Sequence, residues 1–396
     1  MAKVDWLGRA LAIAQLETIT VTGPVVAAET WTVTINGKSY THAAVAGTTA
    51  DVTAGLVALL NASEELEFSS ITWADADPDI TATADDAGVP FTLTVSTNSA
   101  GGSIATVTTT AATGPNHADN VNNWSSGTVP AAADDVHVQN TAVSILYGLD
   151  GIDAVTFASF HVHASFTGEI GLPKTNDAGY PEYRAEYLLV DSTLAFFHEG
   201  EGSGSGRLKI DFDTIQTAIE VRGTGGALET GVPALLIKGT HASNTLDVHD
   251  GTVGVAFFGT EVAAVVTSSQ SGGDVILGPG CTLTTLQVQG GSLVAESNST
   301  TITQDGGTVT ILGSATVGTI DLREGVLDYL SSGTATTVNI GGKPNPATID
   351  CSRDRSGRTF TTTTLHENGR IVDPAKTITH TNGVAVGANV SEVNAA

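Results

Sequence analysis

Two aspartates in the segment KIDFD, Asp211 and Asp213, are the first candidates for acid–base chemistry in this chain. Enzymes that hydrolyse polysaccharides use a pair of carboxylates about 5 to 9.5 Å apart. Alternate residues of a strand share a face and lie about 6.5 Å apart, so an extended KIDFD segment would give that separation. A pair of solvent-facing carboxylates on an acidic protein is the simpler interpretation, and we prefer it.

Three tyrosines form the best candidate for binding sugar rings. Tyr180, Tyr183 and Tyr187 cluster in the segment GLPKTNDAGYPEYRAEY at 171–187, which has the composition of an external loop. Aromatic faces can stack on sugars, although such a cluster is more often a packed loop. In the segment SRDRSGR at 352–358, Arg353, Asp354 and Arg355 could hold an acidic sugar, but a local ion-paired turn is favoured there.

Two histidines could chelate a metal. His161 and His163 in FHVHAS are two residues apart and so share one face of an expected strand. No third ligand with a persuasive spacing is found nearby in the sequence. Stacked or solvated histidines are therefore the preferred interpretation.

An acidic segment could bind calcium through oxygen ligands. Asp75, Asp77 and Asp79 lie in WADADPDITATADD at 73–86. The segment lacks the glycine and the terminal glutamate of an EF-hand loop, so an acidic loop is preferred. We expect neither a bound metal nor a cofactor.

The remaining composition argues against several classes of function. The sequence contains no P-loop, nucleophile elbow, dinucleotide-binding fingerprint or CxxC pair, and we expect no enzymatic activity. The formal net charge of −26 and the pI near 4.4 disfavour binding to nucleic acid or to an anionic membrane. No run approaches the ~18 apolar residues needed to cross a bilayer.

A repeated phrase determines the expected architecture. In TTLQVQGGSL, TTITQDGGTV, GTIDLREGVL and TTVNIGGK, the residues Leu286, Ile302, Ile320 and Val338 occupy the same place, 16, 18 and 18 residues apart. Each unit has two β-rich stretches and a turn glycine (Gly290, Gly306, Gly325 and Gly341), which is the content of one solenoid rung. The predicted fold is mainly β: a small N-terminal α/β domain, a sheet plus one helix, followed by a single-stranded β-solenoid (parallel β-helix).

The chain divides into five expected parts. They are an N-terminal arm (1–17), a small α/β docking domain (18–112), a linker and solenoid cap (113–135), the β-solenoid (136–385) and a C-terminal tail (386–396). At about 18 to 20 residues a rung, the solenoid would make roughly 12 to 14 turns and a rod about 60 Å long.

Local signals refine these parts. Asn36-Gly37 suits a type I′ hairpin turn. A helix is expected at TTADVTAGLVALLNAS, where apolar residues recur at helical spacing: Val52, Leu56, Leu59 and Leu60. Cys281 and Cys351 lie 70 residues apart, about four rungs or 19 Å, so we expect two buried or semi-buried free thiols rather than a disulfide.

Several motifs resemble those of tailed-bacteriophage virion structural proteins with a β-solenoid region. They are the opening Trp6, Gly8, Ala10, Ala12, Ala14 and Gln15, and the segments TWTVTINGKSY, NWSSGTVP, SFTGEIGLP and EGSGSGR. In similar proteins a tryptophan at the junction caps the coil and an Asp-Asp-Val step begins the first strand. The resemblance transfers that structural role to Trp124, Asp134, Asp135 and Val136.

The resemblance implies a non-enzymatic virion component, most simply a capsid decoration or head-fibre protein. We expect Trp6, Leu7, Leu11 and Ile13 to dock it on the major capsid protein or another virion protein, and the solenoid to project outward. A homotrimer is expected, because phage appendages commonly use threefold sites.

Two alternatives stay open. The first is a tail spike or fibre that binds or cleaves host surface polysaccharide, and the second is a bacterial surface adhesin. The absence of any aromatic residue after Phe360 favours decoration over a receptor-binding tip. No export signal is recognised at the N-terminus, so we expect assembly in the host cytoplasm and a final location on the virion surface.

Overall fold

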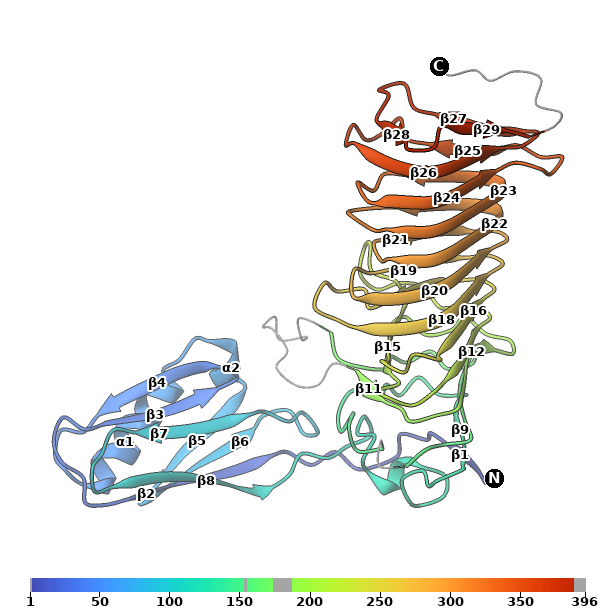
Figure 1. Cartoon of the computed structure of the whole chain (residues 1–396). Coiled ribbons are helices and arrows are strands. Elements are labelled where there is room, and N and C mark those ends of the chain that lie inside the picture. Colours follow the sequence, from blue (N-terminus) through green and yellow to red (C-terminus); the bar gives the residue numbers. More distant parts are fainter. Residues whose placement is uncertain (1, 153–154, 174–186, 388–396) are drawn as a thin grey trace.

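The chain forms a small N-terminal domain beside a long β-solenoid (Figure 1). The computed structural model describes residues 2–152, 155–173 and 187–387. It is mainly β, with 47% strand and 5% helix, and the solenoid makes about 11 turns. The predicted fold class is therefore confirmed.

The N-terminal domain contains two antiparallel sheets and one long helix. The four-stranded sheet has the order β5-β6-β2-β8 and the three-stranded sheet has the order β4-β3-β7. The elements are β2 (Leu16–Thr22), β3 (Thr30–Ile35), β4 (Lys38–Ala43), α1 (Thr49–Asn61), α2 (Leu66–Ser69), β5 (Ile71–Ala76), β6 (Asp79–Ala84), β7 (Leu93–Thr97) and β8 (Ser103–Thr110).

Local sequence explains two features of this domain. Asn36 and Gly37 both have positive φ, 48° and 84°, as a type I′ turn requires, and they join β3 to β4 as predicted. Helix α1 begins after Thr48, whose hydroxyl accepts a hydrogen bond from the Asp51 amide. The helix buries Val52, Leu56 and Leu60, as its apolar spacing predicted, whereas Leu59 is 37% exposed.

The solenoid is built from parallel strands that stack rung upon rung. Its elements are β1 (Lys3–Asp5), the 3-10 turn η1 (Val121–Asn123), β9 (Asp135–Val138), β10 (Ser159–His163), β11 (Leu188–Leu189), β12 (Leu194–Glu199), β13 (Leu208–Asp211), β14 (Ala218–Val221), β15 (Leu235–Lys238), β16 (Thr245–Val248), β17 (Thr252–Val255), β18 (Ala263–Gln270), β19 (Asp274–Leu277), β20 (Cys281–Val288), β21 (Ser292–Ala295), β22 (Ser299–Ile311), β23 (Val317–Tyr329), β24 (Thr334–Ile340), β25 (Ala347–Asp350), β26 (Arg358–Leu365), β27 (Gly369–Val372), β28 (Ile378–His380) and β29 (Val384–Val386). Each strand pairs mostly with the second strand after it, so two series of strands run along the rod. The 13-residue strands β22 and β23 take part in both series.

The register of the clearest rungs is the predicted one. Leu286 pairs with Ile302, Ile302 with Ile320, and Ile320 with Val338, and all four side chains are fully buried. The other series stacks a second apolar column: Leu235, Val253, Val275, Leu293, Val309, Leu327 and Ile349. These two columns face the interior and form the narrow core that no single rung could make.

A column of glycines marks one corner of the coil. Gly273, Gly291, Gly307 and Gly325 all have positive φ, which glycine adopts without steric cost. A Cβ atom on Gly325 would lie 2.6 Å from the carbonyl oxygen of Gly307 one rung away, and the contacts repeat along the column. Buried Gln304 fixes the corner by donating hydrogen bonds to the carbonyls of Gly307 and Val326, at 3.0 and 2.9 Å.

The start of the chain closes the base of the solenoid. Strand β1 pairs in parallel with β9, 132 residues later at Lys3 and Asp135, so the N-terminal domain is inserted between the first two strands of the rod (Figure 1). Asp5 exchanges hydrogen bonds with Ser125, which covers the outer edge of β1. The expected N-terminal arm therefore begins with a short strand laid on a neighbouring strand of the same chain, and none of residues 2–17 is helical.

Two tryptophans pack together inside this base. The rings of Trp6 and Trp124 meet edge to face with centroids 5.1 Å apart. The Trp6 indole N–H donates to the Val143 carbonyl at 2.9 Å, and Trp124 donates to the Ala118 carbonyl at 2.7 Å. The predicted cap residue Trp124 therefore lies in the solenoid core, and the first strand after the junction begins at Asp135 as expected.

The early rungs stay in the coil but use more chain for each turn than the clear repeats. Phe160 pairs with Ala195, 35 residues later, whereas Leu286 pairs with Ile302, 16 residues later. Because these early turns use more residues than the 18 to 20 assumed for each rung, the rod makes about 11 turns rather than the expected 12 to 14.

Both cysteines are buried free thiols, as predicted. Burial raises the pKa of Cys281 to about 12 and that of Cys351 to about 11, so both stay protonated and poorly nucleophilic at neutral pH. Among the described helices, none has the length and apolar character needed to cross a membrane.

Candidate functional site

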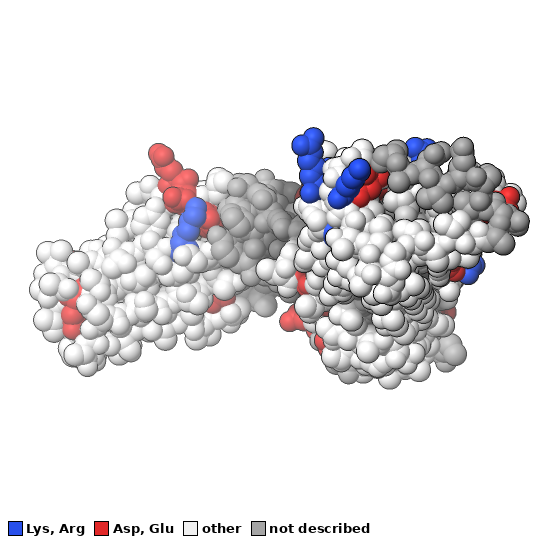
Figure 2. All heavy atoms as spheres, turned by 45° about the horizontal axis from the view of Figure 1, so that its top comes forward, with Lys and Arg blue, Asp and Glu red and all other residues white. Residues whose placement is uncertain are grey.

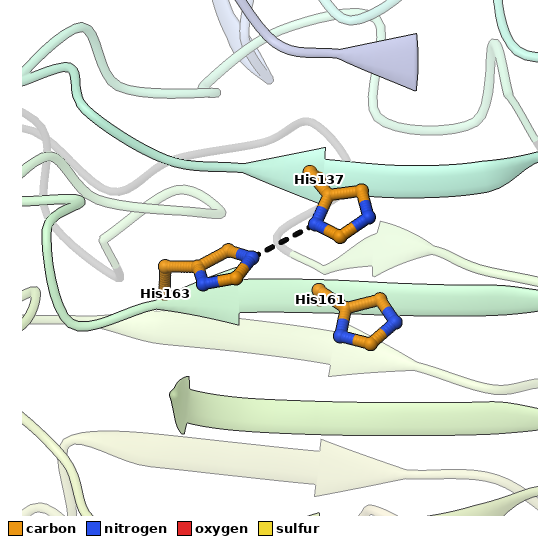
Figure 3. Close-up of side chains that lie close together, drawn as sticks. All are labelled: His137, His161 and His163. Atoms are coloured by element: carbon orange, nitrogen blue, oxygen red, sulfur yellow. Dashed lines mark hydrogen bonds between the residues drawn. The ribbon is translucent and has the colours of Figure 1, made fainter. Parts of the chain in front are cut away.

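Three histidines meet on the outer face of the rod close to its base (Figure 3). His137 lies on β9, and His161 and His163 lie on β10, with His161 directly beside His137 in the register. The alternating residues Val136, Phe160 and Val162 are buried in the core, so the strand period turns the imidazoles outward.

The imidazole rings are in direct contact. His137 Nδ1 and His163 Nε2 form a hydrogen bond of 2.8 Å, and the rings of His137 and His161 stack with centroids 4.5 Å apart. One nitrogen from each histidine lies within 4.8 Å of the others. In the part of the chain that the structure describes, this is the one group of three or more potential metal-binding side chains at such distances.

Two carboxylates flank the histidines on different sides. Asp135 lies 3.0 Å from His137 Nε2 and 3.2 Å from His161 Nε2, measured from its carboxylate oxygens. Glu199, at the end of β12, accepts a hydrogen bond of 2.5 Å from His161 Nδ1 and is the register partner of His163. The Nε2 atoms of two rings therefore face Asp135, while the opposite side holds Glu199 and His163.

The surroundings shift two of these groups. Burial by itself would raise the pKa of Asp135, but hydrogen bonds from Ser159 and His137 and attraction to the histidines hold it below the ordinary value. Burial, followed by repulsion from His137, lowers the pKa of His163. The lowered pKa favours the neutral form of His163, and a neutral imidazole has a lone pair available for a metal or a proton.

The sequence pointed to His161 and His163 but missed His137. The missing signal is the match between DVHV at the first strand and FHVH at the second, which stacks His137 on His161. Longer loops separate these early strands, so the rung period that would have aligned them is absent. The histidine rings are stacked, as the preferred interpretation expected. The third potential ligand, which the sequence did not reveal, is His137 on the neighbouring rung.

A separate cleft brings together two predicted sites. Asp211, Asp213 and Tyr187 all line one open cleft of about 500 Å³ beside β13 and β15. Asp211 pairs with Lys238 at 3.1 Å across adjacent rungs. The expectation that both aspartates lie on one strand is wrong, because β13 ends at Asp211 and Asp213 adopts positive φ in the following turn.

Tyr187 is held in the wall of this cleft. Its hydroxyl donates to Glu261 at 2.5 Å, and the Lys238 ammonium lies 4.2 Å from the centre of its ring. The ring is buried, so it does not offer an open platform for a sugar. Tyr180 and Tyr183 lie outside the described residues.

The expected docking residues separate into buried and exposed ones. Trp6 is only 1% exposed and belongs to the solenoid base, and Leu7 is half-buried beside it. Leu11 and Ile13 are 84% and 45% exposed on the connection between the base and the N-terminal domain. Only these last two present apolar surface of the kind that a partner could cover.

The other candidates form local contacts. Asp79 accepts a hydrogen bond from the Thr20 hydroxyl at 2.6 Å, while Asp75 accepts one from the Asp77 amide at 3.3 Å, and the three are not gathered into a ligand set. In the SRDRSGR turn, Arg353 pairs with Asp328 on the preceding rung. That turn is ion-paired, as preferred.

Figure 2 shows acidic and basic side chains scattered among uncharged residues on the face in view. That face presents no continuous basic surface of the kind that nucleic acid binds, in keeping with the net charge of −26.

The fold and these sites define a class: the chain is a parallel β-solenoid protein with a small sheet domain inserted at the base. Comparison with protein-family models and with curated proteins gives no match. The function is therefore argued from the geometry of the chain and from the motif resemblance described above.

Proposed function

We propose that this chain is a non-enzymatic fibre- or spike-type structural protein of a tailed-phage virion, most simply a capsid decoration or head fibre. The observation that carries the proposal is the shape: a stiff rod of about 11 stacked turns, with a compact domain emerging from its closed base (Figure 1). Such a rod separates what is attached at its base from what is displayed along its length. The resemblance of several sequence motifs to those of tailed-phage structural proteins is the reason for proposing that the particle is a virion.

The base region is the proposed attachment end. Leu11 and Ile13 expose apolar side chains there, on a segment that is otherwise fixed by the Ile13–Thr113 backbone bridge. Exposed apolar residues on a backbone already held in place lose little entropy when a partner covers them. A virion protein is the proposed partner, and self-association into a homotrimer is part of the same proposal.

A docking variant tests this attachment. Changing Leu11 and Ile13 together to aspartate is expected to leave folding intact, because both side chains are exposed, and to reduce incorporation into particles at least about tenfold, since desolvating two charges opposes docking. The amount of protein for each purified particle is measured on stained gels or by mass spectrometry.

A matched control changes Val26 and Val45, which are also exposed apolar residues but lie in loops of the inserted domain. This control is expected to incorporate normally. Equal incorporation of both double variants would place the attachment surface elsewhere and overturn this part of the proposal.

The second candidate function is binding or cleavage of host polysaccharide, and the cleft at Asp211 favours it. Two carboxylates and an ammonium offer hydrogen bonds to sugar hydroxyls, and the cleft is large enough for about two sugar rings. Asp211 is already ion-paired with Lys238, so we propose that the cleft binds polysaccharide rather than hydrolyses it.

Incubation of the protein with host surface polysaccharide distinguishes the two functions. For a decoration protein we expect no new reducing or unsaturated ends above a protein-free blank. Product formation that Asp211→Asn abolishes, and that the distant Asp274→Asn leaves unchanged, would replace the first proposal with the tail-spike alternative. Asp274 is a suitable control because it lies on the exposed end of β19 outside the cleft.

A further inference from the structure

The histidine cluster has the composition and arrangement of a metal site. Three imidazoles approach one another on the outer face of the rod, and a carboxylate stands on the same side. Imidazole nitrogen is the usual ligand for Zn²⁺, Ni²⁺ and Cu²⁺, and three histidines with one carboxylate oxygen make a complete tetrahedral set.

We propose that His137, His161 and His163 bind a divalent transition-metal ion of the Zn²⁺ type. Glu199 supplies the fourth ligand. The donor atoms are His137 Nδ1, His161 Nδ1, His163 Nε2 and a Glu199 carboxylate oxygen, which share the side of the cluster away from Asp135.

Two donor pairs of this assignment are already in contact, and one nitrogen from each of the three histidines lies within 4.8 Å of the others. Zn–N bonds of 2.0–2.1 Å place two tetrahedral nitrogens about 3.3 Å apart. His137 Nδ1 and His163 Nε2 are 2.8 Å apart, and His161 Nδ1 and Glu199 are 2.5 Å apart, as hydrogen-bonded pairs. An ion would replace the shared proton of each pair, the histidine pair would open by roughly 0.5 Å, and the His161–Glu199 pair would open by roughly 0.8 Å.

Asp135 completes the site from behind. Its two carboxylate oxygens lie 3.0 Å from His137 Nε2 and 3.2 Å from His161 Nε2, the ring nitrogens opposite the donor atoms. Metal-bound histidines commonly present their second nitrogen to a carboxylate, which fixes the tautomer and leaves the other nitrogen free to bind. Asp135 is therefore a positioning residue.

The site would join three successive strands of one series. His137 comes from β9, His161 and His163 from β10, and Glu199 from β12. These strands lie where the short repeat is absent: Phe160 pairs with Ala195, 35 residues later. Because the ligands come together only in the folded rod, metal binding stabilises this part of it.

The test uses the full chain without an affinity tag, freed of metal by a chelator. Calorimetric titration with Zn²⁺ is expected to give one equivalent bound for each chain, and Co²⁺ is expected to give the intense visible absorption of a four-coordinate ion. The melting temperature is expected to rise with Zn²⁺.

Variants separate this site from general surface binding. His163→Ala is expected to lose the bound equivalent and the Co²⁺ absorption, while Asp135→Asn keeps one equivalent with about 10- to 100-fold weaker affinity. The matched control is His249→Ala. His249 is 45% exposed on the same solenoid and lies near Glu220 and Asp247 without a histidine cluster, so its loss is expected to change nothing.

Two outcomes would overturn the proposal. Absence of stoichiometric binding and of the Co²⁺ absorption in the unaltered protein does so whether or not any variant folds. An equal loss of binding in His249→Ala and His163→Ala would show nonspecific surface binding. The melting curve of each variant without metal establishes that it is folded.

Discussion

Replacing Trp6 with alanine is expected to lower the free energy of unfolding of the solenoid base by about 3–5 kcal/mol. Trp6 is fully buried, packs edge to face on Trp124 and donates a hydrogen bond to the Val143 carbonyl. Truncation removes both contacts and leaves a cavity and an unpaired carbonyl at the end of the core.

The loss should be local, because each rung contacts only its neighbours. Hydrogen exchange measured by mass spectrometry is expected to show lost protection in β1 and β9 and unchanged protection in β22–β24. Leu11→Ala is the control, since Leu11 is exposed close by in sequence. Unchanged protection of β9 in the Trp6 variant would mean that the chain start does not close the rod.

The burial of Trp6 means that deleting the N-terminal segment is not a clean test of attachment to the particle. Deleting residues 1–17 would remove β1, the Trp6 ring and the first residues of β2 together. A truncated chain that fails to join particles could then fail because its base has opened. Point substitutions at Leu11 and Ile13 test attachment without that ambiguity.

Replacing Ile320 with aspartate is the second large effect, with an expected loss of at least about 3 kcal/mol of stability. The side chain lies in the core between Ile302 and Val338, where a carboxylate has neither water nor a cation. Thermal or urea unfolding followed by circular dichroism measures the change.

Val326→Asp on the same strand is the matched control for this substitution. Val326 is 38% exposed, so its aspartate stays hydrated and is expected to change stability by less than about 1 kcal/mol. A similar melting temperature for the Ile320 variant and the unaltered chain would show that the inward register is wrong.

The sequence was sufficient for the regular half of the rod. Leu286, Ile302, Ile320 and Val338 could be aligned by eye because each rung there has nearly the same length, and the structure pairs them in that order. The turn glycines were found to within one residue: the positive φ falls on Gly291 and Gly307, rather than on Gly290 and Gly306.

The base could not be predicted in the same way. β1 pairs with β9 across an inserted domain of about a hundred residues. No local sequence pattern indicates which distant strand a three-residue strand will pair with. Trp6 was therefore expected at a docking surface, although the structure buries it. An isolated tryptophan near the N-terminus fits either place on its residue type alone.

The candidate sites were hard to predict for the same reason: they depend on the pairing of strands that are distant in sequence. His137 and His163 are 26 residues apart and meet only because two irregular rungs stack. Tyr187 and Asp211 were each selected from sequence, yet their shared cleft arises from the pairing of β11 with β13. Residue type indicated the chemistry, and long-range register determined which residues share a site.

Cryo-electron microscopy of particles assembled with this protein tests the central claim most directly. The account predicts rod-shaped density on the capsid, with the base and the inserted domain at the particle surface and the C-terminal rungs farthest from it. Density confined to the tail would contradict the decoration proposal, and rods attached by their C-terminal rungs would contradict docking through the base.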